Sequence, residues 1–95
     1  MATLSTNAHR QMDILSRVIR PEADDLTIPA AHSLLKLDFE ERDRAQMQEL
    51  SRKARDGSLT PDEQADLDGY EVVGHLLGLL HSKARRAIRK RRSGS

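Results

Sequence analysis

The chain has 95 residues, a third of which are charged, and a formal net charge of +1 at pH 7. This length predicts a single domain over residues 1–92 with a modest hydrophobic core. The sequence has no cysteine, which excludes disulfides, thiolate metal sites and a cysteine nucleophile. Because the first ten residues also lack the apolar run of a secretory signal, we expect a cytoplasmic protein.

A weak helical pattern is present in residues 1–20, which we interpret as a variable N-terminal segment. Four apolar residues recur at helical spacing, namely Ala8, Met12, Leu15 and Ile19. The stretch ILSRVI could equally form a short extended run, and we favour the helix. This helix should end before Pro21, because the residue that precedes a proline is pushed out of the α region.

A short helix is predicted after the acidic connector PEADDLT. The residue just before the helix is either Thr27 or Ile28, because Pro29 suits the first turn of a helix. The segment AAHSLLKL follows, with an apolar stripe made of Ala31, Leu34 and Leu35. We expect this stripe to lie across the longer helix near the C-terminus.

A third helix is predicted over residues 38–57. Asp38 is expected to cap it, with Glu41 in the reciprocal position of a capping box, and Gly57 is expected to end it. Its buried side is marked by Phe39, Met47, Leu50 and Ala54.

The longest helix is predicted over residues 60–92. Thr60, Pro61 and Glu63 form a strong helix start, since Thr60 and Glu63 can cap each other and proline fits the first turn. One apolar seam then contains Tyr70, Val73, Leu77, Leu80, Ala84 and Ala87, and a second seam contains Val72, Leu76, Leu79 and Lys83. A helix that is apolar nearly all round is a central one, so we expect its middle to be covered.

The middle of this helix also carries two glycines and two leucines that we expect to be central. Gly74 and Gly78 each cost about 1 kcal/mol relative to alanine in a helix, which predicts close approach of another helix. Leu77 and Leu80 are expected in the core, so that truncation of either to alanine would cost about 2 to 5 kcal/mol. The apolar run is far shorter than the ~20 residues that cross a bilayer.

The short link at residues 57–60 predicts that the third and fourth helices form an antiparallel hairpin in an all-α fold. This hairpin should bring Phe39 near residues 77–80 and place the basic residues of 52–55 opposite the acidic residues of 62–66. The long helix would overshoot its partner by ~15 Å. We therefore expect the first forty residues, or a second molecule, to cover Ala84, Ala87 and Ile88.

Charge is divided between two blocks of the chain. Residues 21–71 contain fourteen acidic and six basic residues, and residues 83–95 contain seven basic residues and no acid. Acids in the first turns and bases in the last turns complement the helix dipoles, which is an alternative explanation for the whole pattern. The basic helix end at residues 83–92 is also a candidate for nucleic-acid binding through phosphates, without sequence specificity, by Lys83, Arg85, Arg86, Arg89, Lys90, Arg91 and Arg92. Residues 93–95 are expected to be a disordered or appended tail.

No catalytic constellation is present in the sequence. His75 shares a helix face with Glu71 and Asp68, but their spacing matches neither HExxH nor the ExxH of di-iron bundles. We therefore predict no metal, no cofactor and no enzymatic activity.

The run KARDGSLTPDEQADLDGYEVVGHLLGLLHSKAR resembles a family of small, largely uncharacterised bacterial proteins with the pattern KARxGxLTPxEQxxLxxYxxVGxLLxLLxSKAR. The similarity extends over roughly residues 19–88. Members of such families are commonly encoded beside a small HNH endonuclease. The resemblance thus implies an antitoxin-like or regulatory protein that binds a nuclease, and it carries over no catalytic residue.

We expect the surface for such a partner to combine apolar and acidic side chains. The apolar candidates are Val72, Leu76, Leu79 and Ile88, and the acidic candidates are Glu40, Glu41, Asp43, Asp62, Glu63, Asp66 and Asp68. Apolar residues would enter a groove while the acids face the basic side of the nuclease. A homodimer could cover the same apolar surface.

Overall fold

The computed structural model describes residues 6–94, and it describes side-chain environments for residues 9–91. Four helices span this part of the chain: α1 (Thr6–Ile19), α2 (Ile28–Leu35), α3 (Glu41–Asp56) and α4 (Pro61–Gly94). No strand occurs between residues 6 and 94, so the predicted all-α fold is confirmed. α4 runs through residues 93 and 94, where a tail was expected, and Ser95 lies outside the described residues.

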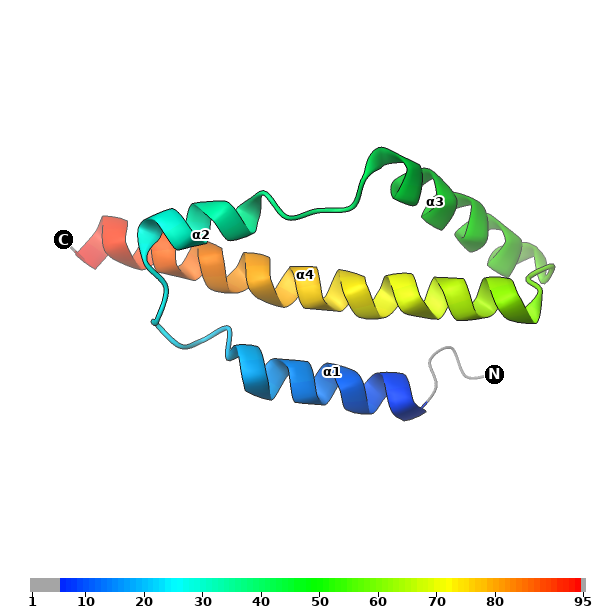
Figure 1. The fold of residues 1–95 in the computed structure, drawn as a ribbon, viewed down its shortest axis with the longest axis horizontal. Coiled ribbons are helices and arrows are strands. Elements are labelled where there is room, and N and C mark those ends of the chain that lie inside the picture. Colours follow the sequence, from blue (N-terminus) through cyan, green and yellow to red (C-terminus); the bar gives the residue numbers. More distant parts are fainter. Residues whose placement is uncertain (1–5, 95) are drawn as a thin grey trace.

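The three shorter helices all pack on α4 and, within the described residues, not on one another. α2 and α3 lie along one side of α4, and α1 lies along the other (Figure 1). The Cα radius of gyration is 16.1 Å, against about 12 Å for a compact domain of this length. The extents of 53 × 28 × 16 Å describe a flat, elongated molecule in which the helices lie side by side.

α2 packs as the sequence predicts, and it begins at the first of the two positions that the sequence left open. Thr27 is its N-cap and accepts a hydrogen bond from the Ala30 N–H at 3.2 Å. Ala31 is fully buried against Ala84 and Ala87 of α4, with four partly buried residues around them, Leu26, Leu34, Leu35 and Ile88. The first forty residues therefore do cover the C-terminal part of the long helix.

The turn between α3 and α4 also follows the sequence closely. Gly57 ends α3 with a φ of 72°, a conformation that favours glycine, and its N–H donates to the Ala54 carbonyl. Thr60 and Glu63 form the predicted capping box, with hydrogen bonds of 3.0 and 3.1 Å. Lys53 pairs with Glu63 across the turn at 2.5 Å, so a basic residue of α3 faces an acidic residue of α4 as predicted.

The start of α3 differs from the prediction. Its N-cap is Glu40, which makes no side-chain capping bond, and the helix begins at Glu41. Asp38 lies two residues too early to cap it. Its carboxylate accepts hydrogen bonds from the Phe39 N–H at 2.8 Å and from the Arg44 guanidinium at 2.6 Å.

The contacts of Phe39 with α4 lie nearer the turn than the residues 77–80 that the sequence predicted. Phe39 makes an edge-on contact with Tyr70 at 5.9 Å between ring centroids, and its ring lies beside Gly74, whereas the carbonyl of Leu37 lies 2.7 Å from the His81 ring. α3 leans away from α4, as Figure 1 shows, so its length projects onto fewer turns of α4. The Phe39 ring, not a helix, is the near neighbour of Gly74, and nothing beyond the local backbone of α4 lies within 4 Å of a Cβ placed at Gly78.

Little of the described chain is deeply buried. The buried apolar residues are Ala31, Leu50, Ala84 and Ala87, and Leu50 alone among them is large. Leu77 and Leu80 are only partly buried, and Val73 is 44 % exposed, so the expectation that the middle of α4 is covered was wrong. The reason is the flat arrangement: α1 and α3 flank α4 without closing over it.

Candidate partner-binding surface

Two shallow grooves flank Val73 on α4. The groove between α1 and α4 has a volume of about 380 Å³ and is lined by Gln11, Ile14, Leu15, Val72, Val73 and Leu76. The groove between α3 and α4 has a volume of about 570 Å³, and its lining includes Phe39, Asp43, Asp66, Gly69, Tyr70 and Val73. We call the surface made by these two grooves, with Val73 between them, the α4 trough.

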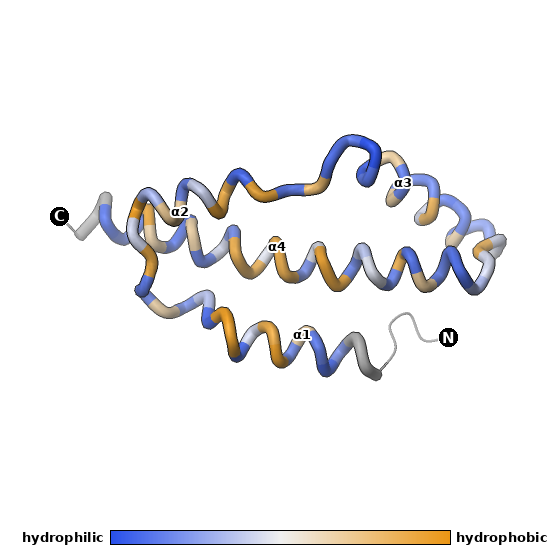
Figure 2. Tube along the Cα trace, in the orientation of Figure 1, coloured by the Kyte–Doolittle hydropathy of each residue, from blue (hydrophilic) through white to orange (hydrophobic). Residues whose placement is uncertain are grey.

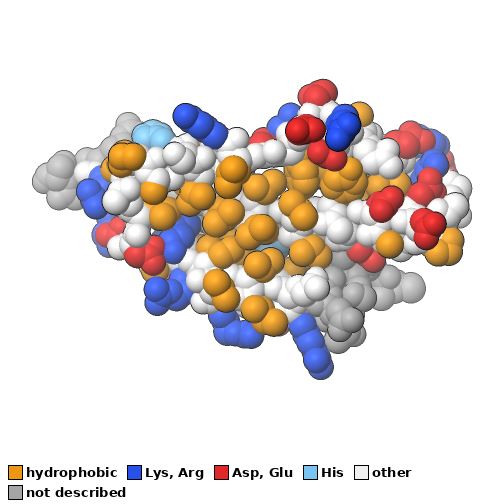
Figure 3. Space-filling model, in the orientation of Figure 1, with side chains coloured by type: hydrophobic (Ala, Val, Ile, Leu, Met, Phe, Trp, Pro, Cys, Tyr) orange, Lys and Arg blue, Asp and Glu red, His pale blue; other side chains and the backbone are white. Residues whose placement is uncertain are grey.

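Apolar side chains are unusually open around the α4 trough. Ile14 and Val73 of its lining are 48 % and 44 % exposed, and Val18, one turn beyond Ile14 on α1, is 72 % exposed. Figure 3 shows hydrophobic side chains gathered over the middle of a broad face of the molecule. Along the chain, apolar positions recur through the middle of α4, while α3 is mainly hydrophilic (Figure 2).

Two of the predicted acidic residues lie within the α4 trough, Asp43 on α3 and Asp66 on α4. Asp43 accepts a hydrogen bond from the Tyr70 hydroxyl at 2.8 Å, and this bond raises the pKa of that phenol. Asp66 is exposed. The trough therefore combines an apolar floor with carboxylates on one side.

The other predicted acidic residues lie outside the trough lining. Glu63 is engaged by Lys53 and the Thr60 N–H, and Asp68 accepts a hydrogen bond from Gln64 at 3.0 Å. The remaining three are exposed, namely Glu40, Glu41 and Asp62.

The predicted apolar residues divide in a similar way. Val72 and Leu76 line the groove beside α1, whereas Leu79 is partly buried outside it and Ile88 packs against the alanines beneath α2. The sequence did not indicate that Val73 is exposed, because Val73 shares with Tyr70 an apolar seam that was expected to be covered. Sequence reasoning also missed Ile14 and Val18, although an apolar pair four residues apart, off the main face of α1, is a detectable signal.

The predicted basic residues are not equivalent in the structure. Lys83 is buried, and its Nζ donates to the Ile19 carbonyl at 2.6 Å and pairs with Asp25 at 2.7 Å. Lys90 pairs with Asp24 at 3.4 Å. The exposed members are Arg85, Arg86, Arg89, Lys90 and Arg91, and the side chain of Arg92 lies outside the described residues.

The Lys83–Asp25 pair predicts a pH-dependent anchorage of the connector between α1 and α2. The hydrogen bond from Lys83 lowers the pKa of Asp25 below its ordinary value of 3.8. The pair should stabilise the fold fully above that value and progressively less as pH falls through the lower, folded pKa. In urea unfolding from pH 6 to pH 2, Asp25→Asn should reduce the decrease in the free energy of unfolding at the acidic end of this range. Lys83→Met should have the same effect, and an additive double variant would contradict this coupling.

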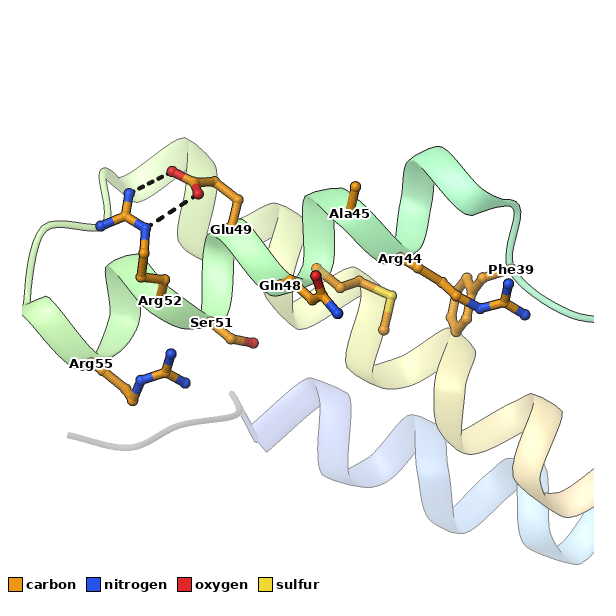
Figure 4. Close-up of a pocket in the computed structure, with 9 residues that line it drawn as sticks. Phe39, Arg44, Ala45, Gln48, Glu49, Ser51, Arg52 and Arg55 are labelled. Atoms are coloured by element: carbon orange, nitrogen blue, oxygen red, sulfur yellow. Dashed lines mark hydrogen bonds and ion pairs between the residues drawn. The ribbon is translucent and has the colours of Figure 1, made fainter.

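A larger groove, of about 850 Å³, lies along α3, with the lining residues drawn in Figure 4. Arg52 donates to both carboxylate oxygens of Glu49, at 2.5 and 3.2 Å, and to Asp56 at 3.0 Å. These bonds raise the pKa of Arg52, and the Arg52 hydrogen bond lowers the pKa of Glu49. Because Arg44 is likewise paired with Asp38, much of the charge in this groove is neutralised locally.

Histidines make no metal cluster in the part of the chain that the structure describes, where no group of three histidine or carboxylate ligands comes together. His75 is partly buried, and the His81 ring nitrogen lies 2.7 Å from the Leu37 carbonyl.

Within residues 6–94, no helix has the length and apolar character needed to span a membrane. Neither a known protein family, nor a curated protein, nor a solved structure matches this chain.

Proposed function

We propose that this protein is a small helical module that binds another protein, namely a co-encoded HNH nuclease that it restrains or regulates in the cytoplasm. The observation that carries the proposal is the α4 trough, where Val73 and Ile14 are about half exposed beside two grooves. Open apolar surface of this kind typically marks an interaction site. An apolar trough on a helical scaffold suits a helix of the partner laid into it.

Electrostatics support a basic partner. Asp43 and Asp66 lie in the α4 trough, and Asp62 is exposed one turn before Asp66 on α4. Nucleases bind a polyanion and need a basic surface to do so. Carboxylates on one side of an apolar floor would therefore speed encounter with such a surface and fix its orientation. The nuclease itself is suggested by the resemblance of residues 53–85.

Mixing the purified protein with the neighbouring gene product tests this function. We expect a stable complex by light scattering and reduced DNA cleavage at micromolar concentration. Val73→Glu should weaken the complex at least ~10-fold, because it places a charge on the apolar floor. The matched control is Ser82→Glu, which adds the same charge nine residues on, at an exposed position on the opposite side of α4. No complex together with unchanged cleavage would refute the proposal.

A second candidate function is nucleic-acid binding by the basic end of α4. It is favoured by the exposure of Arg85, Arg86 and Arg91 on consecutive turns. The same titrations should therefore include duplex DNA and RNA at low salt. Binding that falls steeply with added salt would favour this reading, because phosphate contacts release counterions.

A further inference from the structure

One face of α4 is covered over only part of its length. Val73, Leu80, Ala84 and Ala87 share this face, at spacings of seven, four and three residues. Its C-terminal part lies under α2, where Ala84 is 0 % and Ala87 is 4 % exposed. Its N-terminal part is the floor of the α4 trough, where Val73 is 44 % exposed. Each molecule thus has, on the same side of α4, a half covered by α2 and an open half around Val73.

The exposed area indicates how much surface remains to be covered. The chain exposes 6727 Å², whereas a compact monomer of its mass would expose about 5500 Å². The difference of roughly 1200 Å² exceeds the ~800 Å² that each partner contributes to a standard stable interface. The elongated shape of the chain contributes to this excess, and association over one broad face would remove a large part of it.

Charge changes sign along this same face. Asp62 and Asp66 lie near the open half of α4, and Arg91 follows Val73 by eighteen residues, which is five complete turns. All three are exposed. Along the chain, this face is therefore first acidic, then apolar and then basic. When two such faces pack antiparallel, the acidic end of each lies opposite the basic end of the other.

We propose that a second copy of this chain covers the α4 trough, with the two α4 helices antiparallel about a two-fold axis in the plane of the broad face. The half of each copy that α2 covers then lies opposite the open half of the other. Apolar contacts centre on Val73, with Ile14 and Val18 at the rim, and the acidic end of each α4 faces the basic end of its partner. An isologous contact of this kind closes at two copies.

This dimer goes beyond the proposed function and does not rest on it. A nuclease that uses the α4 trough would have to displace the second copy, so partner binding and self-association compete. The dimer is tested with the purified chain alone. A chain that does not dimerise would therefore not contradict the nuclease complex, and a chain that does not bind the nuclease would not contradict the dimer.

Sedimentation of the full chain gives the first test. We expect twice the chain mass of 10.7 kDa at tens of micromolar, with dissociation on dilution. Added salt should raise the dissociation constant, because the two charged ends attract. A chain that sediments as a monomer throughout this range would overturn the proposal.

Distances between spin labels test the antiparallel arrangement without disturbing the trough. Since the chain has no cysteine, Asp62→Cys carries a single label at the acidic end of α4, where Asp66 keeps a negative charge. The separation along α4 between residues 62 and 91 predicts about 45 Å between the two labels of an antiparallel dimer. A parallel pair would bring them much closer together, and that result would overturn the arrangement.

Two charge insertions locate the interface on α4. Val73→Glu should raise the dissociation constant of the dimer at least ~100-fold, because both copies then bury an unpaired carboxylate. Ser82→Glu, on the opposite side of α4, should leave it unchanged. A native dimer in Val73→Glu would contradict the proposal. If Val73→Glu loses its helical circular dichroism, the label distances in the Asp62→Cys protein decide the question.

Discussion

Replacing Leu50 by alanine is expected to lower the free energy of unfolding by about 2 to 5 kcal/mol. Leu50 is 1 % exposed and is the largest fully buried side chain in the described part of the chain. It lies on α3, whose packing contacts are with α4, so the cavity would open between these two helices. Because small domains are stable by only about 5 to 15 kcal/mol, this loss would remove much of the total.

Urea unfolding at one fixed chain concentration measures this effect, since association would shift apparent stability. Leu37→Ala is the matched control, because it removes the same atoms from a side chain that is 47 % exposed. It should cost well under 1 kcal/mol. Equal costs for the two variants would mean that α3 is not held by Leu50. Leu77→Ala and Leu80→Ala should fall between them, because both leucines are only partly buried.

The sequence predicted helix ends well where short-range chemistry determines them. The capping box of Thr60 and Glu63 and the left-handed Gly57 both depend on residues within a few positions of one another. Asp38 shows the limit of this reasoning. It has the right chemistry for a cap, but Arg44 and the Phe39 N–H hold its carboxylate two residues before the actual N-cap.

Burial was harder to predict because it depends on the tilt of one helix against another. Spacing correctly placed Val73 on the same seam as Ala84, but spacing cannot tell which part of a seam is covered. α2 closes over Ala84, while α1 and α3 stand on either side of Val73. Four residues that the sequence suggested for the surface do line the trough, namely Val72, Leu76, Asp43 and Asp66. Its most exposed apolar residues, Ile14 and Val73, were not among those suggested.

The second large effect is expected from Ala84→Leu, which tests whether α2 is held by close helix contact. Ala84 and Ala31 are both 0 % exposed, and they meet in the one described core cluster, which joins α2 to α4. Three added carbon atoms have no space there unless the helices separate. We expect a loss of about 1 to 3 kcal/mol or more, as for other overpacked cores.

Hydrogen exchange distinguishes this loss from general unfolding. In Ala84→Leu, protection of the α2 amides should fall while the α3 amides, which do not depend on this cluster, keep theirs. Ala54→Leu is the matched control, because Ala54 is exposed on α3 and a leucine there has room. A wild-type melting curve for Ala84→Leu would show that α2 can shift without cost. Since α2 covers the half of α4 that faces the second copy in the proposed dimer, its detachment should also weaken that dimer. The same variant therefore connects the packing of the monomer to its association.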